Sequence, residues 1–225
     1  MFKMDNFESS INNSDLTDYI SAQFNNFFPS KQKVKPEEIS SSVAKAIERI
    51  QYNFQHINLP YYFQKGKVVF NHLHGDHYCI FLCYLSEALF KSNNIENASK
   101  AFSLNKLLHG IDAFYEIEFP DVFLVIHPIG TILGRAKYSN YMVFYQNVTI
   151  GTDLSGVYPT FKGKHVLYSK ASIIGECIIS EGVNFGAGSF IMNTNIESNK
   201  NIVGSYPNHR ILEDKKNIIN NLFNI

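Results

Sequence analysis

The sequence predicts an α+β protein in which a helical N-terminal half is followed by a parallel β-helix of hexapeptide repeats. Two observations predict this fold. In the first half, the apolar residues recur with helical spacing. From residue 126 onward they recur every six residues, a period that fits neither a helix nor a simple strand alternation. We place a helical domain at 1–111, the β-helix at 112–212 and a C-terminal tail at 213–225.

Four helices are expected in the first half. One covers 17–28, and a second covers 36–51, with Pro36 in the first turn, where proline is tolerated. The apolar stripe in 78–91 predicts a third helix, with Cys79 and Cys83 on its buried side. A fourth covers 95–109 and ends at Gly110, since glycine commonly follows the last helical residue. The letters KVVF at 67–70 predict a short strand before the third helix.

The six-residue series defines the second half. Its apolar members are Ile126, Ile132, Tyr138, Phe144 and Ile150, and after an interruption Phe161, Leu167, Ile173, Ile179, Phe185 and Ile191. One residue is then dropped, and Ile196 and Ile202 follow. In a β-helix each member points inward and stacks on its equivalent in the next coil. Three sides of six residues give a coil of about 18 residues.

The composition narrows the class of protein. Lys plus Arg and Asp plus Glu are both 20, so the chain has no basic excess and we expect no nucleic-acid partner. No apolar run approaches the roughly 20 residues of a membrane helix, and the first residues contain no apolar signal core. We therefore expect a soluble, cytoplasmic protein. The three cysteines form no CxxC pair, which predicts no disulfide framework.

The letters HLHGDH at 72–77 pose a separate question. They follow the HxHxDH pattern with which metallo-β-lactamase enzymes supply zinc ligands at the end of a strand. Those enzymes also need a later His, a bridging Asp and a final His on an αββα sandwich. Here the downstream sequence gives helices and then the six-residue series, so we expect no metal. A zinc-dependent hydrolase remains the alternative from another enzyme class.

Three stretches of the second half resemble the serine acetyltransferases, which are hexapeptide-repeat acyltransferases. They are IHPIGTILGRAKYSNYMVFYQNVTIG at 126–151, GVYPTFKGKHV at 156–166, and ASIIGECIISEGVNFGAGSFI at 171–191 with GSYPN at 204–208. His127, Gly130 and Gly134 fall on the family's histidine and glycines, and QNVT at 146–149 falls on its QSVT. The resemblance covers about 112–212. It implies a left-handed parallel β-helix, acetyl-CoA as the donor, and a homotrimer with sites between neighbouring subunits.

By this resemblance His127 is the catalytic base. An acceptor hydroxyl is a poor nucleophile near neutral pH, and a histidine can remove its proton as the oxygen attacks the thioester. Backbone N–H groups or the Asn147 amide would stabilise the oxyanion. In the family an upstream acidic residue orients the histidine, and Glu116 or Glu118 is the local candidate.

The resemblance also suggests residues for the acceptor and the donor. Asp76 lies where the family reaches the acceptor with an acidic residue, and His74 or His77 would lie beside it; alternatively Asp76 caps a helix that starts near Tyr78. Small residues of the late coils, Gly175, Gly186, Ala187 and Ser205, would admit the pantetheine arm, and Lys215 and Lys216 could contact phosphates.

Two substitutions leave the acceptor open. Tyr158 occupies the position of the family's second active-site histidine, and Ile126 replaces the carboxylate that precedes the catalytic histidine. Both L-serine and a sugar or related intermediate of surface polysaccharide synthesis are therefore candidate acceptors. A non-catalytic β-helix that serves as an oligomeric scaffold is a third interpretation of the chain.

Overall fold

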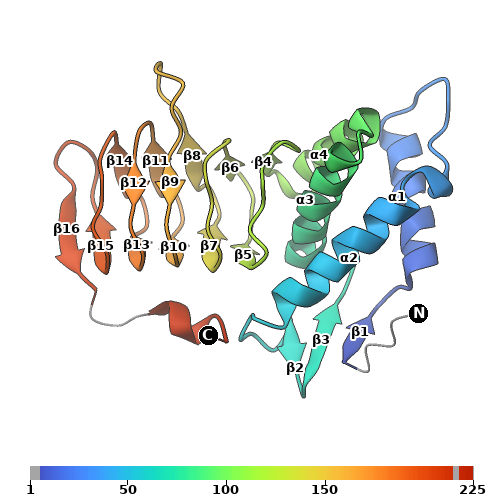
Figure 1. Cartoon of the computed structure of the whole chain (residues 1–225), viewed down its shortest axis with the longest axis horizontal. Coiled ribbons are helices and arrows are strands. Elements are labelled where there is room, and N and C mark those ends of the chain that lie inside the picture. The colour runs from blue at the N-terminus through green and yellow to red at the C-terminus, as the bar shows by residue number, and fades with distance from the viewer. Residues whose placement is uncertain (1–5, 215–217, 225) are drawn as a thin grey trace.

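The computed structural model describes residues 6–214 and 218–224. Lys215 and Lys216, and with them part of the tail expected at 213–225, lie outside these ranges. The helical half and the coils of a parallel β-helix lie end to end along the molecule (Figure 1). Within the described residues, no helix has the length and apolar character needed to cross a bilayer.

The four expected helices are present; the first three begin at other residues than predicted, and the fourth has the predicted bounds. They are α1 (Asn13–Phe27), α2 (Ser40–Phe54), α3 (Gly75–Lys91) and α4 (Ile95–His109). Pro36 lies in a separate 3₁₀ turn, η1 (Pro36–Glu38), just before α2. Gly110 ends α4 in the left-handed conformation, as expected. Cys79 and Cys83 are both buried in α3.

A small sheet packs beside the helices. Strand β3 (Lys67–Phe70) is the KVVF strand expected from the sequence, and it pairs with β1 (Phe7–Ser9) and β2 (Phe63–Gln64). The Phe70 side chain is buried at the end of β3. Residues 71–74 then connect β3 to the start of α3. The sheet therefore fixes where the HLHGDH stretch begins.

The β-helix has three faces of parallel strands. The first is the sheet of β5 (Phe123–Ile126), β7 (Met142–Tyr145), β10 (His165–Leu167), β13 (Val183–Phe185) and β15 (Lys200–Val203), to which β16 (Arg210–Glu213) adds an antiparallel edge. The second is β4 (Asp112–Ala113), β6 (Ile132–Leu133), β8 (Thr149–Gly151), β11 (Ser172–Ile174) and β14 (Phe190–Met192). The third contains β9 (Thr160–Phe161) and β12 (Ile178–Ile179).

The six-residue series forms the core of these coils, with one correction. The strand register stacks Phe144, Leu167, Phe185 and Ile202 on one face, as the series predicts. In the first coil, however, Val125 and not Ile126 aligns with Phe144, and Leu133 and not Ile132 aligns with Ile150. Ile132 is 46% exposed. The cause is the turn at 127–131, which is two residues longer than the equivalent turn at 146–148 and shifts the phase.

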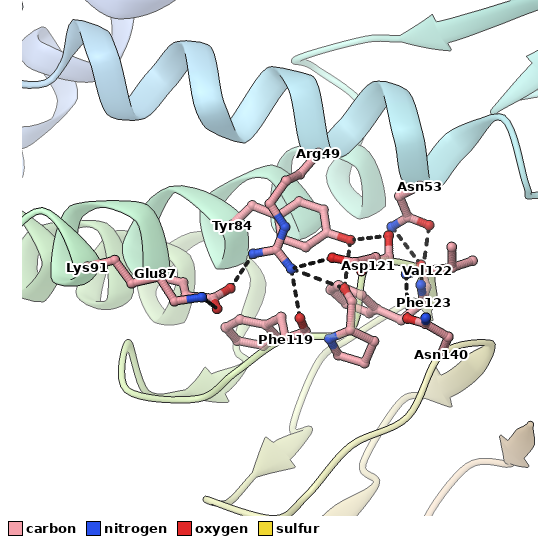
Figure 2. Close-up of polar contacts among 11 residues, drawn as sticks. Arg49, Asn53, Tyr84, Glu87, Lys91, Phe119, Asp121, Val122, Phe123 and Asn140 are labelled. Atoms are coloured by element: carbon pink, nitrogen blue, oxygen red, sulfur yellow. Dashed lines mark hydrogen bonds and ion pairs between the residues drawn. The ribbon is translucent and has the colours of Figure 1, made fainter. Parts of the chain in front are cut away.

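A polar network joins the helical half to the first coil (Figure 2). The Asn53 side chain, from α2, donates to the Phe123 carbonyl (2.9 Å) and accepts from the Phe123 N–H (3.2 Å). The Arg49 guanidinium donates to the Phe119 carbonyl (2.7 Å), and the Tyr84 hydroxyl donates to the Pro120 carbonyl (3.0 Å). The segment that leads into β5 is thus held by side chains of α2 and α3.

The end of the chain returns to the same junction. After β16 the described residues 218–224 contain η2 (Ile218–Asn221) and lie against the loop that follows α2. The Asn58 N–H donates to the Leu222 carbonyl (2.8 Å), and the Asn224 N–H donates to the His56 carbonyl (2.8 Å). Phe223 is buried there and its ring contacts Tyr141 in the β-helix.

We predict that replacing Asn53 by alanine destabilises the whole chain. The substitution removes two hydrogen bonds and leaves the buried N–H and carbonyl of Phe123 without a partner, which costs about 2–4 kcal/mol. Glu48→Ala, an exposed position of the same helix, is the matched control. Denaturant unfolding measures the difference. Equal midpoints for the two variants would contradict the proposed role of this network.

Candidate functional site

His127 stands on the turn between the first two faces of the first coil. It follows β5 and adopts a left-handed backbone with φ 51°. For a residue with a Cβ this region costs roughly 1–2 kcal/mol. Pro128 follows, and a proline pushes the preceding residue towards extended conformations. The side chain is exposed in the single chain. The turn therefore holds the predicted base in a conformation that its own sequence disfavours.

Asp76 is the residue of the helical half that reaches this turn. Its Oδ1 accepts a hydrogen bond from the His127 backbone N–H at 3.2 Å, across 51 positions of sequence. Burial raises the pKa of the Asp76 carboxyl, and the His127 N–H and the nearby His74 and His127 side chains oppose that rise. The helix α3 begins at Gly75 with His74 at its N-cap, so the expectation that Asp76 caps a helix starting near Tyr78 is wrong.

The histidines of the HLHGDH stretch have separate surroundings. His77 is buried, and its Nδ1 accepts from the Asn71 N–H at 3.1 Å. Burial lowers the pKa of His77 to about 3, so the ring is neutral near pH 7 and carries its proton on Nε2. The His74 ring lies 4.2 Å from that of His77 between centroids. The Nδ1 atom of His72 lies 2.8 Å from the Ser10 hydroxyl.

Metal ligation by these residues finds no support in the structure. Over residues 6–214 and 218–224, no group of three or more His, Cys, Asp or Glu side chains is placed to hold a metal ion. The fold around the stretch is a helix start beside a β-helix. The αββα sandwich that the zinc pattern requires is not the architecture of the described chain.

The turns between the first and second faces form one column, which we call the first corner. It consists of the turns at 127–131, 146–148, 168–171 and 186–189, and the residues after β15 that begin at Gly204. Backbone hydrogen bonds connect successive turns, from the Asn147 N–H to the Ile129 carbonyl (3.0 Å) and from the Gly188 N–H to the Ser169 carbonyl (2.8 Å). His127 lies in the first of these turns.

Half of the predicted site residues lie at this first corner. Asn147 is exposed in the turn directly after that of His127, and its side chain packs against Gly130. Gly186 and Ala187 lie further along, and Ser205 lies in the last coil beside Phe190. Four strand spacings separate the His127 and Ser205 turns, which is roughly 19 Å. The predicted base and three of the predicted donor-binding residues therefore share one edge.

Tyr158 and Gly175 lie elsewhere, on the turns between the second and third faces, which we call the second corner. Tyr158 ends the loop at 152–158 that projects from the β-helix after β8 (Figure 1). Its ring lies against Gly134, where an added Cβ would come within 2.5 Å of Tyr158 Cε1. Gly175 is left-handed and packs against the Asn193 side chain. The structure therefore does not place these two residues beside His127 within one chain.

The Tyr158 loop is fixed at its base. The Asp153 carboxylate accepts hydrogen bonds from the Asn193 side chain (2.8 Å) and from the Ser155 N–H (2.8 Å). These bonds hold the pKa of Asp153 at about 2, below its usual range. Asp153 lies in the second coil and Asn193 in a later coil. The bond between them therefore connects the loop at 152–158 to that later coil.

Among the acidic residues, the structure adds a candidate that sequence reasoning missed. Glu116 forms an ion pair with Arg135 at 2.8 Å and is partly exposed. Asp112 instead opens β4, and its N–H donates to the Thr131 carbonyl (2.8 Å) in the very turn that begins at His127. Its carboxylate pairs with Lys106 at 2.6 Å. The register pairs Asp112 with Ile132, so the backbone of Asp112 lies next to the turn of His127.

Comparison with known proteins identifies the fold. No family model matches the chain. A serine acetyltransferase of Synechococcus elongatus is 30% identical over 105 residues, which span 45% of this chain and 43% of that relative. The matched stretch thus covers less than half of the relative's length.

Solved structures agree with that relative. A serine acetyltransferase from Neisseria gonorrhoeae matches with a TM-score of 0.68 and 14% identity, over 92% of this chain and 85% of that one. One from Brucella abortus strain S19, in complex with coenzyme A, matches with a TM-score of 0.66 and 14% identity, over 92% and 84%. The chain has the fold of these proteins, helical half included, and the resemblance predicted from the sequence is confirmed.

Proposed function

We propose that this chain is an acetyl-CoA-dependent O-acetyltransferase of the serine acetyltransferase type. One observation carries the proposal. His127 lies at one end of the first corner, and Gly186, Ala187 and Ser205 lie at the other. At the far end of this edge Ala187 and Ser205 are exposed, and a Cβ added at Gly188 meets nothing within 4 Å. An extended acyl-pantetheine arm could follow such an edge towards the imidazole.

The chemistry needs no covalent enzyme intermediate. The His127 imidazole removes the proton of the acceptor hydroxyl while the oxygen attacks the thioester carbonyl of acetyl-CoA. The carbonyl becomes an oxyanion, which the Asn147 amide or backbone N–H groups of the first corner would stabilise. When the tetrahedral intermediate collapses, the carbon–sulfur bond breaks and the imidazolium returns its proton to the departing thiolate. The products are the acetyl ester and free coenzyme A.

A homotrimer belongs to the proposal. Tyr158 and Gly175 lie at the second corner, away from His127 in the same chain. A neighbouring copy that packs its second corner against this first corner would supply both residues to the site. The coenzyme A complex from Brucella abortus supports the choice of donor. A cytoplasmic location, where acetyl-CoA is available, completes the proposal.

The acceptor is L-serine or a sugar hydroxyl. Serine carries an amine and a carboxylate, and each needs a partner of opposite charge. In this chain Ile126 and Tyr158 supply no charge, which favours a neutral hydroxyl-bearing acceptor such as a sugar. His74 is the group of the helical half that we propose on the acceptor side, and Asp76 beside it contacts the His127 turn.

We predict that His127→Ala strongly lowers acetyl-CoA turnover, because the base that accepts the hydroxyl proton is lost. The measurement is thiol release by the purified protein with L-serine, homoserine and nucleotide-linked sugars as acceptors. Removal of a general base typically costs about 10²–10⁴-fold in rate. A chelator should leave turnover unchanged, and zinc-dependent turnover would instead support the hydrolase. Wild-type protein that is silent with every acceptor would support the scaffold.

A second prediction concerns the residue that orients His127. If Asp112 has this role, Asp112→Asn lowers kcat, because a neutral partner no longer stabilises the imidazolium. Glu116→Gln then leaves kcat near the wild-type value, although it also removes an ion pair, that with Arg135, just as Asp112→Asn removes the pair with Lys106. The two variants are matched, because each replaces one carboxylate by its amide. A loss of kcat in Glu116→Gln alone would restore the assignment made from the sequence.

A further inference from the structure

The contact between Asp76 and His127 assigns a role that neither residue's sequence context suggests. We propose that Asp76 is a positioning residue, whose carboxylate oxygen holds the His127 backbone N–H and thereby fixes the left-handed turn that presents the imidazole. The proposal rests on the proposed function, because it concerns the geometry of the predicted base.

The turn at 127–131 is strained at His127. Two features oppose the observed backbone of His127, its Cβ and the proline that follows. Another left-handed position of this turn is Gly130, which has no Cβ, and the equivalent position of the next turn is Asn147, a residue that tolerates the geometry. A histidine in that conformation persists only where its surroundings hold it.

A hydrogen bond to the helical half holds the His127 turn in this conformation. The N–H of His127 donates to Asp76 Oδ1 at 3.2 Å. β5 is the last strand of its sheet, and the Asp76 carboxylate receives the N–H of the residue that follows it. A charged acceptor makes the stronger type of hydrogen bond. If the bond were lost, the backbone could relax towards the extended region and carry the imidazole to a new position.

Asp76 is itself held in place by helix α3. It lies in the first turn of α3, where the helix dipole favours a negative charge. The next residue, His77, is anchored by its bond to the Asn71 N–H and by ring contacts with Tyr62 (4.4 Å between centroids) and Phe54 (4.8 Å). Helix α3 therefore offers a rigid acceptor, and the contact transmits the placement of the helical half to the catalytic turn.

Two substitutions of Asp76 separate the positioning role from a role in binding the acceptor. An oxygen that binds the acceptor through its charge cannot be replaced by an amide oxygen. An oxygen that only accepts a backbone N–H can be so replaced, since an asparagine side chain keeps one acceptor oxygen. Asp76→Asn and Asp76→Ala therefore distinguish the two roles.

The experiment compares these two variants in steady-state turnover of acetyl-CoA with an acceptor that the wild-type protein uses. We expect Asp76→Ala to lower kcat by about ten- to a hundredfold, the loss of one hydrogen bond to a charged group, with little change in the KM of the acceptor. Asp76→Asn keeps an acceptor oxygen but loses its charge, so its kcat should stay at least about threefold above that of Asp76→Ala. Asp15→Ala, which removes a first-turn carboxylate of α1, should change neither constant.

Two kinetic outcomes overturn the proposal. One is an unchanged kcat in Asp76→Ala. The other is a raised acceptor KM with unchanged kcat in both variants, which would make Asp76 an acceptor ligand. Hydrogen exchange at the His127 amide tests the contact without any activity. Protection should fall in Asp76→Ala and persist in Asp76→Asn, and equal protection in all forms refutes the contact. Wild-type protein without turnover would refute the proposed function alone, because the exchange result would still decide this proposal.

Discussion

The site depends on the docking of the helical half against the first coil of the β-helix. Asn53 binds both backbone groups of Phe123, and Arg49 and Tyr84 bind the carbonyls just before it (Figure 2). Arg49 also pairs with Glu87, whose side chain is 3% exposed. Lys91 pairs with the same carboxylate at 2.6 Å, so two cations balance this buried charge, and loss of both would be strongly destabilising. The network therefore couples the position of α2 and α3 to the start of β5, which ends one residue before His127.

The β-helix and the helical half contribute different parts of the candidate site. The β-helix supplies a straight edge, because each coil repeats the previous one at the spacing of neighbouring strands. The helical half supplies the one carboxylate that holds the first turn of that edge. Without the helices the corner would still offer small residues for a donor, but the strained turn of His127 would lose its partner. Under the proposed function, catalysis would need both halves in register.

The sequence predicts the repeating parts of this structure well and its exceptions poorly. The series from Phe144 to Ile202 is confirmed, because stacking demands an apolar residue at each inward position. In the first coil the predicted residues Ile126 and Ile132 are wrong, because Val125 and Leu133 take the inward positions. Each correct residue has an apolar neighbour, so the sequence does not reveal the longer turn. The bond between Asp76 and His127 joins residues 51 apart. It follows from how the halves dock, which no local pattern records.

The central claim is that the first corner carries the donor to His127, and coenzyme A binding tests it most directly. Ala187 is exposed at this corner, so Ala187→Trp should fill the path of the pantetheine arm without disturbing the core. Ser198→Trp makes a similar change at an exposed turn between the third and first faces. Calorimetry should show binding by wild type and Ser198→Trp, and at least a tenfold weaker affinity for Ala187→Trp, about 1.4 kcal/mol. Equal affinity in all three proteins would contradict the account.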